Sequence, residues 1–182
     1  NFPLRGTGGR WTSVRLDGGE VGPIDVLGWS FPEVTVPSSP LDLLDEIPDG
    51  DHTIGVLHCD ADRTEGRYAP VRREALARLP VDAWLLGHIH DPSVDWVNDQ
   101  LQLYPGSPQP LDPGEDDTHG AWQIDVPAVG PVQTELLPLA SLRYDTVTVD
   151  VSDLDDPGTA DTLALRALRS ALTAAVERRP RL

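Results

Sequence analysis

The chain has 182 residues, enough for one ordinary domain or for a domain plus part of another. Its single cysteine, Cys59, excludes an internal disulfide and a cysteine-rich zinc site, and it suits a reducing cytoplasm. Thirty acidic against fourteen basic residues give a formal charge of −16. This charge argues against a generic nucleic-acid binder, because phosphate backbones are held by clustered Lys and Arg. It does not argue against a metal site, where bound cations meet the phosphate.

No apolar run approaches the length of a membrane span, so we expect no membrane partner. Every basic residue is arginine, and aspartate outnumbers glutamate, which gives a surface that repels itself at low salt. Concentrated salt suppresses this repulsion by shortening the Debye length to about 3 Å at 1 M, so a salt-loving source is favoured. An acidic protein from a GC-rich genome is the alternative. Because the chain starts at Asn1 and lacks methionine, we expect it to be a piece of a longer protein.

The first sixty residues predict strands with one short helix. Two strands, Arg10–Leu16 and Ile24–Phe31, are separated by the turn signal Asp17-Gly18-Gly19. A short helix is expected within Pro37–Gly50, where leucines lie among Pro and Asp. Thr53–His58 is a continuous apolar run ending in histidine, a pattern typical of a strand covered on both faces.

The middle of the chain predicts a β-α-β unit followed by antiparallel strands. Asp60–Tyr68 is polar and expected to be a loop, and Pro70–Leu79 is expected to be a helix. Ala83–His88 is a second buried-strand candidate. The segment Pro105–His119 is rich in Pro and Gly and predicts a long loop. The further strands expected are Ser93–Val97, Gln100–Tyr104, Ala121–Val126 and Val132–Leu137.

The composition changes after about Pro138. Strict alternation predicts a strand at Tyr144–Val151, followed by a turn at Asp153–Gly158 and a long helix over Thr159–Arg179. We therefore expect residues 1–139 to form one unit and residues 140–182 to open a second. The apolar stripe of the helix is Leu165, Leu168, Leu172 and Val176.

Three histidines follow apolar strands. His88 and His90 point the same way if their strand continues, and His58 ends the preceding buried strand. Two adjacent parallel strands joined by a right-handed crossover would bring all three to the carboxyl edge of a sheet, where ligands bind in α/β folds. Imidazole is a common metal ligand, so the spacing predicts a metal site. The alternative is a set of partly exposed strand histidines.

Five short motifs stand in order along residues 53–125. They are L-H at Leu57-His58, Y-A-P at Tyr68–Pro70, L-G-H-I-H at Leu86–His90, Y-P-G-S at Tyr104–Ser107 and H-G-A-W at His119–Trp122. With these motifs the segment resembles the C-terminal half of a calcineurin-like metallophosphoesterase domain. More narrowly, it is similar to the DNA-repair exonuclease group that includes the nuclease subunit partnering an SMC-type ATPase. The residues after 140 resemble the start of that group's capping domain.

The resemblance implies an α/β fold. This is a four-layer metallophosphoesterase-type β-sandwich flanked by helices, present as its second half and followed by a short β-α cap element. It implies two divalent ions, usually Mn2+ in the nuclease group, with His58 and His88 on one ion and His90 on the other. The chemistry is two-metal hydrolysis of phosphodiesters. Ser107 is a candidate substrate-binding residue, against a plain turn serine. The implied partners are DNA and an SMC-type ATPase, and a homodimer is a further option.

The carboxylate half of the family's site has no counterpart here. The motifs D-x-H, G-D-x-x-D and G-N-H-[DE] do not appear upstream of His58, so no catalytic acid–base residue is assigned. Three histidines without bridging carboxylates leave the charge of two cations uncompensated. We therefore expect this chain alone to be inactive and its parent to be a metal-dependent repair nuclease.

Two other functions stay open. The parent is then either another calcineurin-like phosphoesterase, acting on a nucleotide or a phosphoprotein, or a non-catalytic binding or scaffolding module that retains the fold. The cap-like tail favours the nuclease, whereas the absent carboxylate motifs favour the scaffold for this chain.

Overall fold

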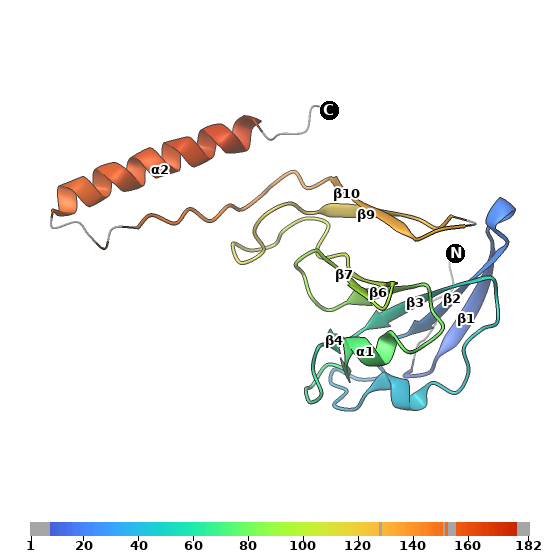
Figure 1. The fold of residues 1–182 in the computed structure, drawn as a ribbon. Helices are drawn as coiled ribbons and strands as arrows, with labels where there is room; N and C mark the ends of the chain where they lie inside the picture. Colours follow the sequence, from blue (N-terminus) through green and yellow to red (C-terminus); the bar gives the residue numbers. More distant parts are fainter. Residues whose placement is uncertain (1–7, 128, 151, 153–155, 178–182) are drawn as a thin grey trace.

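A computed structural model describes residues 8–127, 129–150, 152 and 156–177 (Figure 1). Its centre is a six-stranded sheet in the order β1-β2-β3-β6-β8-β7. The four inner strands run parallel, and β1 and β7 are antiparallel edge strands. These strands are β1 (Thr12–Asp17), β2 (Pro23–Trp29), β3 (His52–His58), β6 (Ala83–Gly87), β7 (Ser93–Val97) and β8 (Gln100–Tyr104).

Two small sheets and a few helices complete the described part of the chain. The strand pairs are β4 (Asp60–Ala61) with β5 (Pro70–Val71), and β9 (Gly120–Asp125) with β10 (Gln133–Pro138). The helices are η1 (Gly19–Val21), η2 (Pro40–Leu43), α1 (Arg73–Leu76) and α2 (Pro157–Glu177). The expected mixed α/β class is confirmed, with few helices. None of the helices in these ranges is long and apolar enough to cross a membrane.

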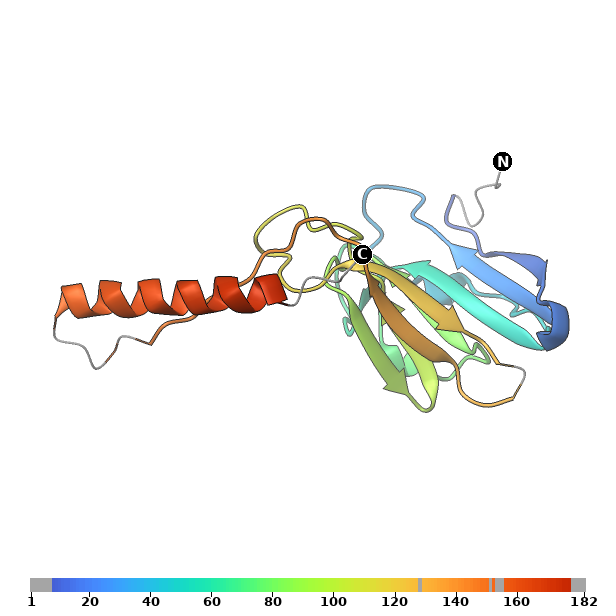
Figure 2. The same ribbon diagram turned by 90° about the horizontal axis from the view of Figure 1, so that it is seen from above.

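The sheet has a different apolar core on each face. On one face, Leu57, Trp84 and Leu86 pack under η2, α1 and the surrounding loops. Here the Trp84 ring of β6 lies directly against Gly55 of β3, where a Cβ would come within 2.2 Å of the ring. On the other face, the β9–β10 hairpin lies over the sheet (Figures 1 and 2). Its Trp122 and Ile124 pack on the second core, whose buried members are Ala83, Leu101 and Leu103.

The hairpin covers only part of its face of the sheet. Its contacts are with β6, β7 and β8, whereas the register places Ile54 and Val56 of β3 on the same face outside the second core. Val56 is 41% exposed and Leu16 of β1 is 48% exposed. The prediction that Thr53–His58 is covered on both faces is therefore wrong for this face. We call it the open sheet face, made by Val14, Leu16, Ile24, Val26, Ile54 and Val56.

The predicted Pro70–Leu79 helix is mostly absent. Pro70 and Val71 instead form β5, paired with β4, and both residues are buried. Only the single turn of α1 is helical. Strand pairing and burial of Val71 thus override helix propensity at the start of this segment, and Asp60–Tyr68, expected as loop, contributes β4. The short helix expected in Pro37–Gly50 is found as the 3-10 helix η2.

The strand predicted at Tyr144–Val151 is wrong over its described residues. Tyr144 makes one isolated bridge to Asp116, and residues 145–150 have no strand partner. Helix α2 is confirmed and begins after Asp156, whose carboxylate accepts from the amide and hydroxyl of Thr159. Val151, residues 153–155 of the predicted turn, and residues 178–179 of the predicted helix lie outside the described residues.

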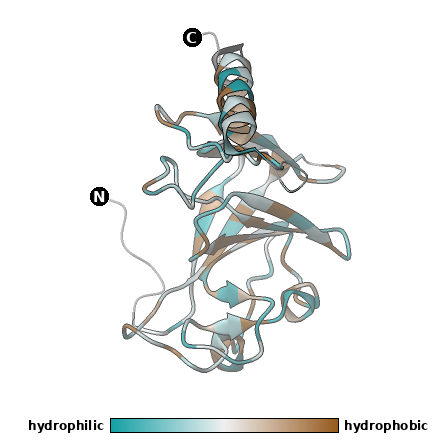
Figure 3. Cartoon of the chain, turned by 90° about the vertical axis from the view of Figure 1, so that its left-hand side faces the viewer, coloured by the Kyte–Doolittle hydropathy of each residue, from teal (hydrophilic) through white to brown (hydrophobic). Residues whose placement is uncertain are grey.

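Helix α2 extends away from the sheets (Figures 1 and 2). Its surface mixes hydrophobic and hydrophilic residues (Figure 3). Three residues of the predicted apolar stripe, Leu165, Leu168 and Leu172, are each about half exposed. The division of the chain at residues 139 and 140 stays a prediction.

Candidate functional site

The sheet brings His58 and His88 together at its carboxyl edge. His58 is the last residue of β3, and His88 directly follows β6, its parallel neighbour. The two imidazole ring centres are 5.4 Å apart. Phe31 meets the His58 ring edge-on, and Tyr68 lies against the His88 ring with centres 4.8 Å apart. The predicted adjacency of these histidines is confirmed.

The backbone between the strands is shaped around this pair. A Cβ on Gly87 would lie 2.8 Å from Nδ1 of His58, so the absence of a side chain leaves room for the ring. His88 has φ 110°, a conformation that L-residues rarely adopt. Such backbone costs about 1–3 kcal/mol and clusters at functional sites. We call the edge made by His58, His88 and His90 the histidine edge.

The environment of His58 favours the neutral form of its imidazole. Burial lowers the pKa of the His58 imidazole below its ordinary value, and the nearby His88 and His90 lower this pKa further. Since an ordinary histidine has a pKa near 6.5, His58 is largely uncharged at neutral pH. The neutral imidazole is the form that binds metal ions. The same interactions place His88 and His90 within electrostatic reach of His58.

His90 is held by a carboxylate that the sequence did not reveal. Its Nδ1 lies 2.6 Å from Oε1 of Glu115, which is buried. Oε2 of Glu115 accepts from the Leu111 amide at 3.1 Å. The hydrogen bond with His90 contributes most, and together these bonds hold the pKa of the Glu115 carboxyl below its ordinary value. Glu115 is therefore ionised at neutral pH.

Ser107 lies in the same network. Its amide donates to the His90 carbonyl at 2.8 Å, and its own carbonyl lies 2.7 Å from Nδ1 of His119. Ser107 and His119 are both buried. His119, expected as loop, is therefore an internal anchor of the loop that carries Glu115. The substrate-binding role of Ser107 stays a prediction, and the structure places the residue beside His90.

The carboxylates near the histidine edge do not complete a metal site. Among the residues that the structure describes, no group of three or more His, Cys, Asp or Glu is arranged to hold a metal ion. Asp60 and Asp62, which follow His58, pair with Arg63 and Arg73. The ligand roles of His58, His88 and His90 stay predictions.

Cys59 is not a nucleophile partnered by His58. It is buried, and its sulfur faces the Tyr104 hydroxyl at 4.0 Å. Burial raises the pKa of the Cys59 thiol to about 12, so the thiolate is scarce at neutral pH.

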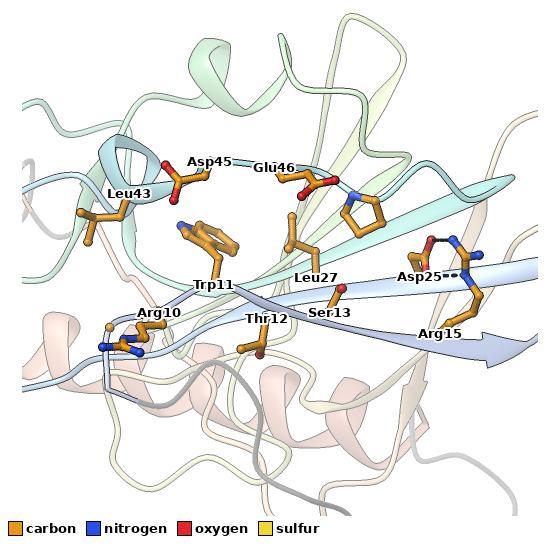
Figure 4. A pocket seen from close by; sticks show the side chains of 12 residues that line it. Arg10, Trp11, Thr12, Ser13, Arg15, Asp25, Leu27, Leu43, Asp45 and Glu46 are labelled. Carbon is orange, nitrogen blue, oxygen red and sulfur yellow. Dashed lines mark hydrogen bonds and ion pairs between the residues drawn. The ribbon is translucent and has the colours of Figure 1, made fainter.

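A groove of ≈ 730 Å³ lies away from the histidine edge, beside β1. Trp11 and Leu27 point into it, and the Arg15–Asp25 pair closes one end (Figure 4). The opposite wall includes Leu43, Asp45, Glu46 and Pro48. None of the three histidines lines this groove, so the groove and the histidine edge are separate candidate sites. We place the candidate site at the histidine edge, where convergent imidazoles and strained backbone coincide.

The Arg15–Asp25 pair predicts an acid-dependent stability. Asp25 is buried, and its two oxygens accept from Arg15 at 3.0 and 2.7 Å. The Arg15 guanidinium lowers the pKa of the Asp25 carboxyl, against the opposing effect of its burial. A lowered folded-state pKa stabilises the fold fully above the unfolded value, about 3.9, and this stabilisation is lost as pH falls through the folded value.

Urea unfolding of the wild type and Asp25→Asn should therefore differ most at neutral pH. The stability gap should stay constant down to about pH 5 and shrink below about pH 4. A gap that stays unchanged down to the lowest pH at which both proteins fold would contradict the ion-pair explanation.

Comparison with known proteins found no match, either to a protein-family model or to a curated protein sequence.

Proposed function

We propose that the histidine edge is one half of a two-metal site that hydrolyses phosphodiester bonds in DNA. The parent protein is then a Mn2+-dependent repair nuclease that works with an SMC-type ATPase, as the motif resemblance implies. In finer terms, the fold is the second half of a metallophosphoesterase β-sandwich. The chain by itself is inactive.

The observation that supports this proposal most is the meeting of His58 and His88 at two adjacent strand ends. Their ring centres lie 5.4 Å apart although thirty residues separate them in the chain. His90 follows within electrostatic reach and is held by a buried carboxylate. A chance pair of surface histidines needs neither the bare backbone of Gly87 nor the positive φ of His88.

The donor set fits part of a metal centre. His58 and His88 would hold one cation and His90 the other, through neutral imidazole nitrogens. When bound, two divalent cations polarise the scissile phosphate, generate a nucleophilic water and clamp the attacking and leaving oxygens. The residues of this chain would hold the ligating imidazoles in position. Glu115 ties His90, and aromatic rings flank His58 and His88.

The open sheet face is where the carboxylate half would sit. It lies on the same side of the sheet as β9–β10 and runs to His58 by register. Exposed contiguous apolar surface marks a site that another layer covers. The half-domain that the resemblance implies would cover this face and bring carboxylates beside the histidine edge.

A non-catalytic binding module is the second candidate. It is favoured by the lack, among the described residues, of a group of three or more ligating side chains arranged for a metal. Such a module would retain the sheet without holding cations. Failure of the parent protein to bind Mn2+ would favour it over the nuclease.

His88→Ala tests the proposed function in the parent protein that contains both halves. We expect the Mn2+-dependent cleavage rate of linear duplex DNA to fall at least about 100-fold, because second-shell changes alone cost 10–100-fold. The measurement is gel-resolved DNA cleavage, run beside hydrolysis of a small aryl phosphodiester. Activity on the small diester without activity on DNA would favour the other phosphoesterases.

His52→Ala is the matched control. His52 begins β3 at the end opposite His58 and faces Asp82. This variant should keep a rate near the wild type. A wild-type rate in His88→Ala, with folding unchanged, would refute the nuclease assignment.

A further inference from the structure

Glu115 is a carboxylate enclosed by the protein beside an exposed histidine. Its side chain is 8% exposed, against 59% for His90. Glutamate is almost never buried without partners, because an unpaired charge in the interior is costly. Here the His90 ring and the Leu111 amide both donate to it. The carboxylate is therefore a fixed, ionised acceptor.

This acceptor decides which nitrogen of His90 carries the proton. An ionised carboxylate can only accept, so Nδ1 of His90 must be the donor at 2.6 Å. In a neutral imidazole the lone pair is then on Nε2, across the ring from the contact with Glu115. A metal-bound histidine almost always donates its other ring N–H to such a partner, which fixes its tautomer and its orientation.

The loop holds the backbone of His90 as well as its ring. The Ser107 amide donates to the His90 carbonyl at 2.8 Å, and the Ser107 carbonyl is bound in turn by His119 at 2.7 Å. The Glu115 amide donates to the Asp112 carbonyl at 3.1 Å, which closes a turn under the carboxylate. His90 is thus fixed at two points by one loop, through its buried residues Ser107 and Glu115.

We propose that Glu115 is a positioning residue, which holds His90 as the Nδ1-protonated tautomer and presents Nε2 as the ligand atom for a divalent cation. The choice of a cation as ligand rests on the proposed function. The tautomer of His90 does not, because it follows from the contact with Glu115.

The first measurement needs no variant. Nitrogen–proton correlation spectra of the histidine side chains, recorded on the whole chain at neutral pH in concentrated KCl, report the tautomer directly. We expect the neutral form of His90 to carry its proton on Nδ1, facing Glu115. A neutral His90 that carries its proton on Nε2 would overturn the proposal.

The second measurement compares Glu115→Gln with Asp112→Asn. Both variants remove one negative charge from the same loop, but Asp112 is exposed and accepts from the Gly114 amide rather than from a histidine. MnCl2 is titrated into each protein, and paramagnetic broadening of the His90 ring signals gives the apparent affinity. Concentrated KCl suppresses non-specific attraction of Mn2+ to the acidic surface.

We expect Glu115→Gln to mix the His90 tautomers and to weaken Mn2+ binding at His90 by about 10–100-fold. Asp112→Asn should change neither. Unchanged tautomer and affinity in folded Glu115→Gln would overturn the positioning role while leaving the proposed function standing. A wild-type His90 protonated on Nδ1, with no Mn2+ broadening even in the parent protein, would support the positioning and refute the metal site.

Discussion

Gly55→Ala should destabilise the fold by about 3 kcal/mol or more, at the upper end of overpacking costs. A Cβ at this position would lie 2.2, 2.3 and 2.7 Å from three atoms of the Trp84 ring. Trp84 is fully buried and packs edge-on against Trp11 with ring centres 6.1 Å apart, so the ring has no space to move into. Urea unfolding followed by circular dichroism measures the loss.

The matched control is Gly28→Ala on the neighbouring strand β2. Its new Cβ would meet nothing closer than the Val56 carbonyl oxygen at 4.0 Å, and it points to the open sheet face. We expect a change within about 0.5 kcal/mol, or a small gain because alanine restricts the unfolded chain. Equal stability of the two variants would show that β3 and β6 are not packed as described.

His119→Ala should cost about 3 kcal/mol, combining a cavity with the buried Ser107 carbonyl group that loses its partner. The imidazole is 1% exposed, with Nδ1 2.7 Å from the Ser107 carbonyl and Nε2 3.2 Å from the Asp116 carbonyl. Because these contacts pin the loop that carries Glu115, the variant should also loosen His90. Thermal unfolding and the histidine spectra measure the two effects.

Thr118→Ala removes a half-buried side chain from the position before His119 and serves as the control. It should leave both the unfolding temperature and the His90 signals near those of the wild type. The role of His119 as an anchor would be contradicted by a His119→Ala protein that unfolds at the wild-type temperature.

The sheet was largely predictable because its strands are apolar runs broken by Pro, Gly and Asp. Every strand of the six-stranded sheet matches a predicted segment, with ends shifted by a few residues. The adjacency of His58 and His88 followed from the right-handed crossover rule, which needs only two parallel strands and a connection. The connection itself was mispredicted, since α1 is one turn, but its exact form does not affect the adjacency.

Other features depend on contacts that no local pattern encodes. The segment after Tyr144 alternates like a strand, yet residues 145–150 form no bridge to a strand in the described part of the chain. Glu115 sits in a Pro- and Gly-rich loop without periodicity. Its partner His90 is twenty-five residues away, and only the folded loop brings them together. Alternation shows that a segment can pair, but it does not supply the partner.

The open sheet face affects how readily copies of the chain associate with one another. At low salt, the formal charge of −16 keeps copies of the chain apart, and this repulsion opposes sticking through the apolar face. In concentrated salt the repulsion is screened, and excluded salts strengthen apolar association. Concentrated salt is thus the condition in which the open sheet face, with its exposed Leu16 and Val56, would self-associate most readily. A covering layer over that face would keep the protein dispersed there.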